Sequence, residues 1–262
     1  MRIVQYTARQ DDGFGILQGG RVIALEGWPA EDVRETGVDH DVGEVQLRCP
    51  VSPSKIVGVG RNYRAHVAEM GYQLPQEPTI FLKPPSSLLA DGGDVVLPPT
   101  ELSQKVQHEA ELAVVIGQRA HRLRPEDALA IVAGVTCAND VSARDLQRQD
   151  NTITRGKGFD TFCPIGPWVE TEFDLTSTVT VSCRVNGELR QEGTTDDLIF
   201  DIPSILAFVT QVMTLERGDV VLTGSPGGTA DLHPGDLVEI EVGGVGTLRH
   251  GVRAADAAAD TD

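Results

Sequence analysis

Two glutamates lie two residues apart in a segment that is otherwise typical of a buried strand. The segment spans 108–117, reads HEAELAVVIG, and is rich in aliphatic residues before its closing glycine. Because successive side chains of a strand point to opposite faces, Glu109 and Glu111 are expected to share one face. Like charges beside an apolar run repel each other and resist desolvation, so a positive group is expected between them. A divalent metal with oxygen ligands meets this need; an exposed edge strand with two solvated glutamates is the alternative.

A third carboxylate, Asp140, follows the apolar run 131–138. An acid at the end of a buried segment often lines a cleft, whereas a turn-forming Asn139–Asp140 pair is the alternative. Together with Glu109 and Glu111, Asp140 would complete a site with three carboxylates. Oxygen ligands alone favour Mg²⁺, Mn²⁺ or Ca²⁺ over zinc and copper.

Lys157 lies between Gly156 and Gly158, and these glycines argue against a lysine on the surface of a helix. Beside a metal site, a lysine can neutralise a substrate carboxylate or an enolate. A structural ion pair between Lys157 and an acid is the alternative.

His66 and Glu69 are three residues apart in a short expected helix, 63–70, which Gly71 ends. That spacing makes two side chains neighbours on one helix face. A carboxylate beside an imidazole sets its tautomer and favours a general base that activates water. An ordinary surface pair is the alternative.

A glycine-rich turn, 223–228, follows the expected strand that ends at Leu222. Backbone N–H groups of such a turn can bind an anion. Neither a helix-forming segment nor a lysine follows, so the turn is not a phosphate-binding loop of the Walker type. A plain tight turn is the alternative.

The composition limits the class of protein. The chain has 262 residues, of which 40% are hydrophobic and 23% charged, and a formal net charge of −17, so no basic stripe is present to bind nucleic acid. No apolar run approaches the roughly 20 residues that a membrane span needs, and the first residues read as a strand rather than a signal peptide. We therefore expect a cytoplasmic protein without nucleic-acid or membrane partners.

The cysteines form no Cys-x-x-Cys pair, which predicts buried reduced thiols at Cys49, Cys137, Cys163 and Cys183.

The pattern of strands and turns predicts a mainly β fold with short helices (α+β). Residues 1–48 are expected to form a small β domain with strands at 2–6, 14–18 and 21–25, followed by an acidic connection at 39–44. The main domain is expected over 49–253, and the Ala- and Asp-rich tail, 254–262, is expected to be disordered. Outside 63–70, we expect helices at 125–133 and 202–211. The remaining strands are expected at 56–60, 79–82, 108–117, 179–185, 219–223 and 237–242.

Six segments together resemble the fumarylacetoacetate hydrolase family over about 53–251, most of the chain. They are 59–63 (VGRNY), 81–86 (FLKPPS), 108–112 (HEAEL), 139–147 (NDVSARDLQ), 156–161 (GKGFDT) and 222–228 (LTGSPGG). The resemblance implies a rolled mixed β-sheet, a homodimer, and a small extra N-terminal domain of the kind found in shorter bacterial members. In this chain Ser225 stands where the family turn has its second threonine, and Thr229 stands where a hydrophobic residue is usual.

The resemblance also implies roles for individual residues. Glu109, Glu111 and Asp140 match the metal ligands, normally for Mg²⁺ or Mn²⁺, and Lys157 matches the lysine that contacts the substrate or its developing negative charge. His66 and Glu69 resemble the lid dyad of the acylpyruvate-hydrolysing branch. The positions expected to bind substrate are Arg61, Tyr63, Arg144, Gln147, Thr223, Gly224 and Ser225.

These roles predict a metal-dependent enzyme that acts on acylpyruvates or related 2-oxo diacids through an enolate. His66, held by Glu69, would activate the water that breaks the C–C bond; without activated water the same chemistry would decarboxylate oxaloacetate. The alternative within the family is a 2-hydroxyhepta-2,4-diene-1,7-dioate isomerase of aromatic catabolism. A non-catalytic metabolite-binding protein and a structural calcium-binding β domain are alternatives from other classes.

Overall fold

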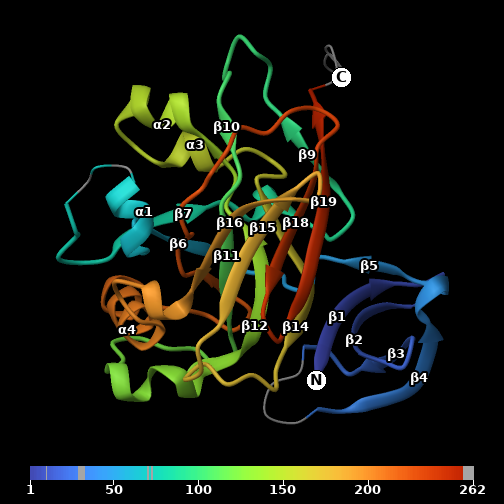
Figure 1. The fold of residues 1–262 in the computed structure, drawn as a ribbon. Helices are drawn as coiled ribbons and strands as arrows, with labels where there is room; N and C mark the ends of the chain where they lie inside the picture. Colours follow the sequence, from blue (N-terminus) through green and yellow to red (C-terminus); the bar gives the residue numbers. More distant parts are fainter. Residues whose placement is uncertain (10, 29–32, 70, 72, 256–262) are drawn as a thin grey trace.

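Two β-sheets dominate the computed structural model, which describes residues 1–9, 11–28, 33–69, 71 and 73–255 (Figure 1). The larger sheet has twelve strands in these ranges, with the order β4-β3-β2-β1-β14-β12-β11-β17-β6-β7; β5 pairs with β1 and β8 with β14. Its strands are β1 (Arg2–Thr7), β2 (Asp12–Gln18), β3 (Arg21–Leu25), β4 (Glu35–Asp41), β5 (Gln46–Arg48), β6 (Ile56–Gly60), β7 (Thr79–Lys83), β8 (Leu88–Leu89), β11 (Ala110–Ile116), β12 (Val132–Asn139), β14 (Cys163–Glu170) and β17 (Val220–Leu222). The predicted mainly β fold is confirmed.

A second sheet has five described strands in the order β16-β15-β18-β19-β9. Its strands are β9 (Asp94–Leu97), β15 (Thr180–Val185), β16 (Glu188–Thr194), β18 (Leu237–Val242) and β19 (Gly246–Ala254), and a short pair is formed by β10 (Val106–Gln107) and β13 (Ser142–Ala143). Asn186 and Gly187, both with positive φ, make the tight turn between β15 and β16. This sheet packs against the large one and supplies residues behind the candidate site.

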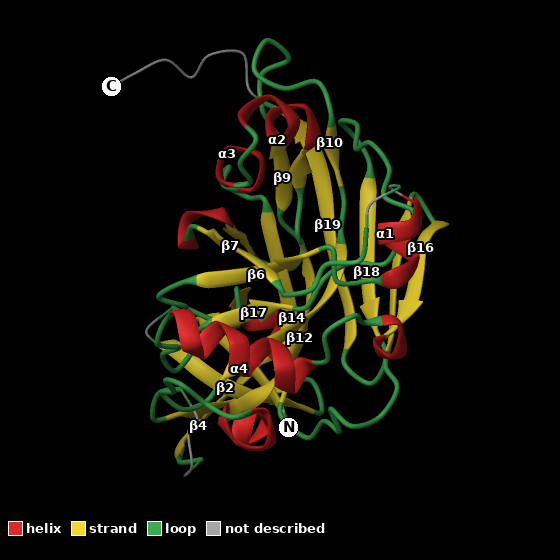
Figure 2. Ribbon diagram, turned by 90° about the vertical axis from the view of Figure 1, so that its left-hand side faces the viewer, coloured by secondary structure: helices red, strands yellow, loops and turns green. Residues whose placement is uncertain are grey.

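The helices are short, as expected from the sequence. They are α1 (Arg64–Glu69), α2 (Arg144–Asp150), α3 (Thr154–Lys157) and α4 (Ile202–Val212), with 3₁₀ turns η1 (Val42–Glu44), η2 (Pro85–Ser87), η3 (Pro125–Ile131) and η4 (Thr195–Asp197). Figures 1 and 2 place α2 and α3 at one end of the molecule and α4 at the other. No described helix is long and apolar enough to cross a membrane.

Strand β11 is buried on both faces, which explains its nearly continuous apolar sequence. Leu112 and Val114 face a large core shared with β15, β18 and α4. Ala113 and Val115 face a second core, to which β1, β14 and β17 contribute. The alternative of an exposed edge strand is therefore wrong, since β11 lies between β12 and β17.

The N-terminal strands continue the large sheet. Strand β1 pairs antiparallel with β14, with Ile3 opposite Val169, and β2 to β4 follow outward from β1. The expected acidic connection at 39–44 is wrong in part, because β4 extends to Asp41 and pairs with β3. The reason is that β4 is an edge strand exposed to water, where acidic side chains are tolerated and Asp39 pairs with Arg21.

Three further expectations need correction. The segment 125–133 is a 3₁₀ helix that ends at Ile131, because Val132 and Ala133 already belong to β12, whose Val132 pairs with Ile116. Strand β19 continues to Ala254, where it pairs with Leu97 of β9, so the expected disordered tail does not include Ala254; residues 256–262 lie outside the described ranges. The predicted helix 63–70 is α1 as far as Glu69, and its last residue lies outside the described ranges too.

Candidate active site

The antiparallel ladder between β11 and β12 brings the three carboxylates together. Ala110 pairs with Asn139, and Glu111 pairs with Ala138. Beside the Ala110–Asn139 pair, the Asp140 N–H donates to the Glu109 carbonyl at 2.8 Å. Glu109 therefore lies opposite Asp140, and Glu111 follows on the same face, as the period of a strand requires. One oxygen of each carboxylate lies within 4.8 Å of the other two.

All three acids are removed from water. The exposed fractions are 7% for Glu109, 2% for Glu111 and 1% for Asp140. Like charges directly opposite each other destabilise a sheet, and burial increases the cost. Positive groups must therefore lie close to these carboxylates.

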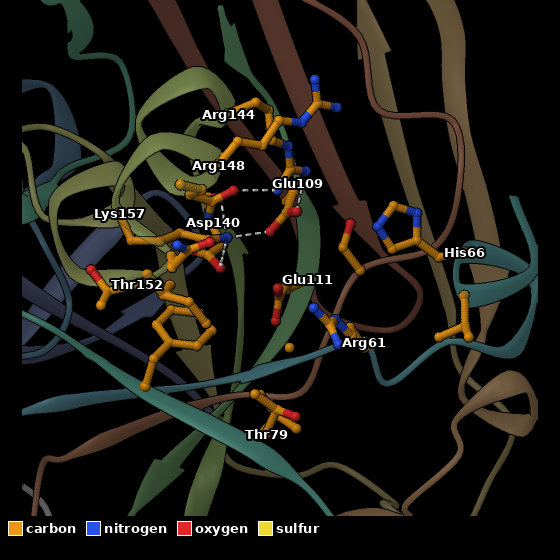
Figure 3. Close-up of a pocket in the computed structure, with 18 residues that line it drawn as sticks. Arg61, His66, Thr79, Glu109, Glu111, Asp140, Arg144, Arg148, Thr152 and Lys157 are labelled. Atoms are coloured by element: carbon orange, nitrogen blue, oxygen red, sulfur yellow. Dashed lines mark hydrogen bonds and ion pairs between the residues drawn. The ribbon is translucent and has the colours of Figure 1, made fainter. Parts of the chain in front are cut away.

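Three buried or partly buried cations meet the carboxylates. The ammonium of Lys157 donates hydrogen bonds to both Glu109 and Asp140, and the guanidinium of Arg144 donates to Glu109 (Figure 3). Lys83 lies 2.8 Å from Asp140 Oδ1 and donates to the Lys157 carbonyl at 2.6 Å. The structural ion pair weighed for Lys157 is thus present. Lys157 is the last residue of α3, but it is buried and contacts the acids, so the prediction that it is no lysine on the surface of a helix is confirmed.

These contacts shift the pKa values of the two glutamates in opposite directions. Burial by itself would raise the pKa of Glu109, but Arg144 and Lys157 outweigh it and hold that pKa well below its usual value. Burial raises the pKa of Glu111, and the charges of Asp140 and Glu109 raise it further. Within the described residues Glu111 has no ion pair, and the Gly224 N–H, at 2.6 Å from Oε2, is its hydrogen-bond donor.

The residues present fit a divalent cation. Three carboxylate oxygens converge, and Glu111 forms no ion pair among the described residues. Asp140 Oδ1 accepts no hydrogen bond from a described residue, since Lys83 approaches it outside hydrogen-bond geometry. An all-oxygen donor set suits Mg²⁺ or Mn²⁺, and Ca²⁺ by the same chemistry. Glu109, Glu111 and Asp140 are the residues that would hold the ion.

A cavity of about 430 Å³ opens in front of the carboxylates. Of the predicted substrate-binding residues, Arg61, Arg144, Gln147 and Ser225 line it, and the catalytic predictions His66 and Lys157 line it as well. In Figure 3, His66 faces the carboxylates from the opposite side of the cavity. His66 Nδ1 lies 3.5 Å from Glu69 Oε2 without a hydrogen bond, and that oxygen instead accepts from the Gly228 N–H at 3.1 Å.

Three predicted substrate-binding residues do not line this cavity. The Thr223 hydroxyl donates to the Leu112 carbonyl at 2.9 Å, so it joins β17 to β11. The Gly224 N–H donates a hydrogen bond to Glu111 Oε2. Tyr63 is buried, and burial together with the charge of Glu111 raises the pKa of its hydroxyl, which has no hydrogen-bond partner among the described residues. These three residues support the site from behind.

Sequence reasoning missed several residues of the site. Lys83 lies in the segment FLKPPS, where a lysine at the end of an apolar strand was the available signal. Phe81 of the same strand lies with its ring centroid 5.1 Å from Lys157 Nζ, within the range of a cation–π contact. Arg148 lines the cavity from the exposed side of α2. Burial raises the pKa of the Cys163 thiol to about 12, which disfavours the thiolate form that a nucleophile needs.

Two family models match the chain. Residues 55–253 match the fumarylacetoacetate (FAA) hydrolase C-terminal family, and residues 1–50 match the Rv2993c-like N-terminal family.

Curated relatives include enzymes of oxaloacetate. An oxaloacetate tautomerase of Bacillus subtilis is 38% identical over 89% of this chain and 83% of its own length. A mitochondrial oxaloacetate tautomerase of Homo sapiens is 42% identical over 78% of this chain and 68% of its own length. A mitochondrial oxaloacetate decarboxylase of Dictyostelium discoideum is 39% identical over 74% of this chain and 90% of its own length.

Solved structures agree in fold. A 5-carboxymethyl-2-hydroxymuconate delta-isomerase from Mycobacterium smegmatis superposes with a TM-score of 0.91 at 37% identity, covering 97% of this chain and 100% of that one. A maleylpyruvate hydrolase from Sphingobium, in complex with manganese(II) and pyruvate, gives a TM-score of 0.81 at 28% identity, covering 98% of this chain and 100% of that one.

Proposed function

The chain belongs to the fumarylacetoacetate hydrolase family, and we propose that this enzyme moves a proton at the carbon beside the keto group of a 2-oxo dicarboxylic acid. Oxaloacetate is the first substrate to test, with decarboxylation as the related outcome. The curated relatives that act on oxaloacetate support this choice. We further propose Mg²⁺ or Mn²⁺ as the metal, and the manganese in the Sphingobium structure supports a divalent ion.

The choice of a dicarboxylic acid as substrate rests on the balance of charge in the site. The three carboxylates are equal in number to the three nearby cations, Lys83, Lys157 and Arg144. A divalent ion would therefore add two positive charges in excess of these described side chains. A substrate with two carboxylates supplies the missing negative charge. Arg61 and Arg148 add positive charge to the cavity wall, which helps a dianion enter despite the net charge of −17.

The chemistry follows from where the side chains lie. A bound divalent ion would supply polarisation of the keto oxygen, and so stabilise an enolate. Lys157 and Arg144 add fixed positive charge where negative charge develops. His66 faces the carboxylates across the cavity and can remove or return the proton at the carbon next to the carbonyl. In decarboxylation no proton is removed: the C–C bond to the departing carboxylate breaks and its electron pair forms the enolate.

Hydrolysis of acylpyruvates is the second candidate. The proximity of His66 and Glu69, 3.5 Å apart on one turn of α1, favours it, because a carboxylate beside an imidazole assists the activation of water. The structural neighbour that hydrolyses maleylpyruvate supports the same possibility. The isomerase alternative draws support from the Mycobacterium smegmatis structure and needs only a shift of the enolate double bond.

A panel of substrates tests the proposal. The purified protein is incubated with oxaloacetate and several acylpyruvates, with Mg²⁺ or Mn²⁺ or with EDTA. Loss of the ultraviolet absorbance of enol-oxaloacetate without pyruvate indicates tautomerisation, pyruvate with CO₂ indicates decarboxylation, and pyruvate with a second acid indicates hydrolysis. We expect metal-dependent turnover of oxaloacetate, lost in Glu111→Gln and kept in the control Glu188→Gln, whose side chain is exposed on the second sheet. Equal rates with EDTA and with metal would contradict the proposal.

The assembly of the chain remains a prediction. We propose a homodimer, as the family resemblance implies. Light scattering coupled to size-exclusion chromatography checks it, and a mass equal to one chain would contradict it.

A further inference from the structure

A chain of buried polar side chains leads from the second sheet to the wall of the cavity. It consists of His108, Gln191 and Ser225, and the first two have exposed fractions of 0% and 1%. Gln191 lies on β16, far from β11 in the sequence. Neither His108 nor Gln191 lines the cavity, but Ser225 does.

The hydrogen bonds that link His108, Gln191 and Ser225 have only one possible direction. The Ala230 N–H donates to His108 Nε2 at 3.2 Å, and a peptide N–H can only donate. His108 therefore carries its proton on Nδ1 and donates it to Gln191 Oε1 at 2.7 Å. The Ala110 N–H donates to the same oxygen at 3.1 Å, which independently identifies Oε1 as the acceptor end of the amide.

The other end of the Gln191 amide faces Ser225. Nε2 donates one hydrogen to the Pro226 carbonyl at 2.6 Å and the other to Ser225 Oγ at 2.8 Å. Ser225 Oγ must therefore accept. Its own hydrogen has one acceptor among the described residues, the Pro226 carbonyl, and at 3.4 Å that contact is longer than an ordinary O–H···O hydrogen bond. Because that contact is long, the Ser225 hydroxyl can instead donate to an acceptor in the cavity that Ser225 lines.

We propose that Gln191, with its amide held by His108, is a positioning residue that makes Ser225 a hydrogen-bond donor to an anionic oxygen of the substrate. The inference rests on the proposed function, since a 2-oxo acid supplies that oxygen as a carboxylate or as an enolate. The same turn carries Gly224, whose N–H holds Glu111, so Ser225 and the carboxylate cluster keep a common geometry. A donor with a fixed direction costs little reorganisation when negative charge develops.

A purely structural role is the competing explanation. Gln191 also satisfies the buried Ala110 N–H and Pro226 carbonyl, and so ties β16 to β11 and to the turn after β17. In that case, removal of Gln191 would harm the protein regardless of what stands at 225. A double-mutant cycle separates the two explanations, because only coupled residues give non-additive effects.

The cycle compares wild type, Ser225→Ala, Gln191→Met and the double variant in kcat/KM for oxaloacetate. We expect each single variant to lose about tenfold or more, as for a lost hydrogen bond to a charged group. The double variant should lose no more than Ser225→Ala alone. Ser225→Thr, which keeps the hydroxyl, should retain most of the activity and remain sensitive to Gln191→Met. Additive losses, or a Ser225→Ala variant as active as wild type, would overturn the proposal.

Two provisions keep the test decisive. If Gln191→Met does not fold, as judged by thermal denaturation, Gln191→Glu replaces it: its carboxylate still accepts from Ala110 but cannot donate to Ser225. If the wild type turns over no 2-oxo acid, the proposed function fails, and the cycle is run instead on the Kd of oxalate in the presence of Mg²⁺. Non-additive losses of oxalate affinity then support the role of Gln191, and additive losses or unchanged affinity overturn it.

Discussion

Lys83 Nζ lies 2.8 Å from Asp140 Oδ1, while Lys157 contacts the other oxygen of the same carboxylate. Asp140 is thus held between two buried lysines. Lys83 also donates to the carbonyl of Lys157, so one ammonium fixes both the acid and the end of α3. This arrangement makes Lys83 a support of the site rather than a group that meets the substrate, since it does not line the cavity.

Replacing Lys83 by methionine should reduce both stability and activity. Removal of one partner of a buried ion pair leaves a poorly compensated charge, which costs about 3–5 kcal/mol of unfolding free energy. Activity should fall as well, because Asp140 and Lys157 lose a common anchor. Denaturant unfolding and kcat measure the two effects. Lys105→Met is the control, since Lys105 is only partly buried and lies just before β10. A Lys83→Met variant with wild-type stability would show that the pair with Asp140 contributes nothing.

Glu111 should make the metal-free protein less stable as the pH rises. Its pKa is raised in the folded state, so its contribution to stability is complete below the ordinary pKa of a glutamate and is lost as the pH rises through the folded value. Glu111→Gln should therefore raise the Tm of the metal-free protein at neutral pH and change it little at acid pH. Thermal denaturation in EDTA across pH measures this difference. A larger gain at acid pH than at neutral pH would contradict the raised pKa.

Divalent ions should stabilise the folded protein through the three carboxylates. A ligand at a hundredfold excess over its Kd adds about 2.7 kcal/mol when it binds only the folded state. Mg²⁺ and Mn²⁺ should raise the Tm of the wild type and leave that of Glu111→Gln nearly unchanged. The exposed control Glu188→Gln should respond like the wild type. Equal shifts in wild type and Glu111→Gln would place the ion elsewhere.

His66→Ala should separate the possible reactions. Loss of a general base lowers the rate about 10²–10⁴-fold, so hydrolysis of acylpyruvates and tautomerisation of oxaloacetate should both fall by that order. Decarboxylation should persist, because it removes no proton from carbon. Rates of all three reactions are compared with those of His121→Ala, which alters an exposed histidine. Full hydrolysis by His66→Ala would exclude His66 as the general base.

The local features of the site follow from the sequence. Strand periodicity predicts that Glu109 and Glu111 share a face, and the apolar residues after them predict burial; the structure shows both. The motif order predicts the family, which the comparisons confirm. The shared face and the burial depend on residues close together in the chain, whose relative geometry the backbone period sets, whereas the family depends on the order of motifs along about 53–251.

Only the tertiary structure decided which distant residues complete the site. Lys83 meets Asp140 because β7 and the end of β12 converge on α3, and Gln191 meets Ser225 because the second sheet packs behind the turn after β17. The same packing turns the Thr223 hydroxyl toward Leu112 and leaves Tyr63 behind the cavity wall. Such contacts join segments far apart in the chain, and no local period encodes them. The sequence by itself therefore determined which groups could do the chemistry, and the packing of the two sheets decided which of them face the cavity and which hold the others in place.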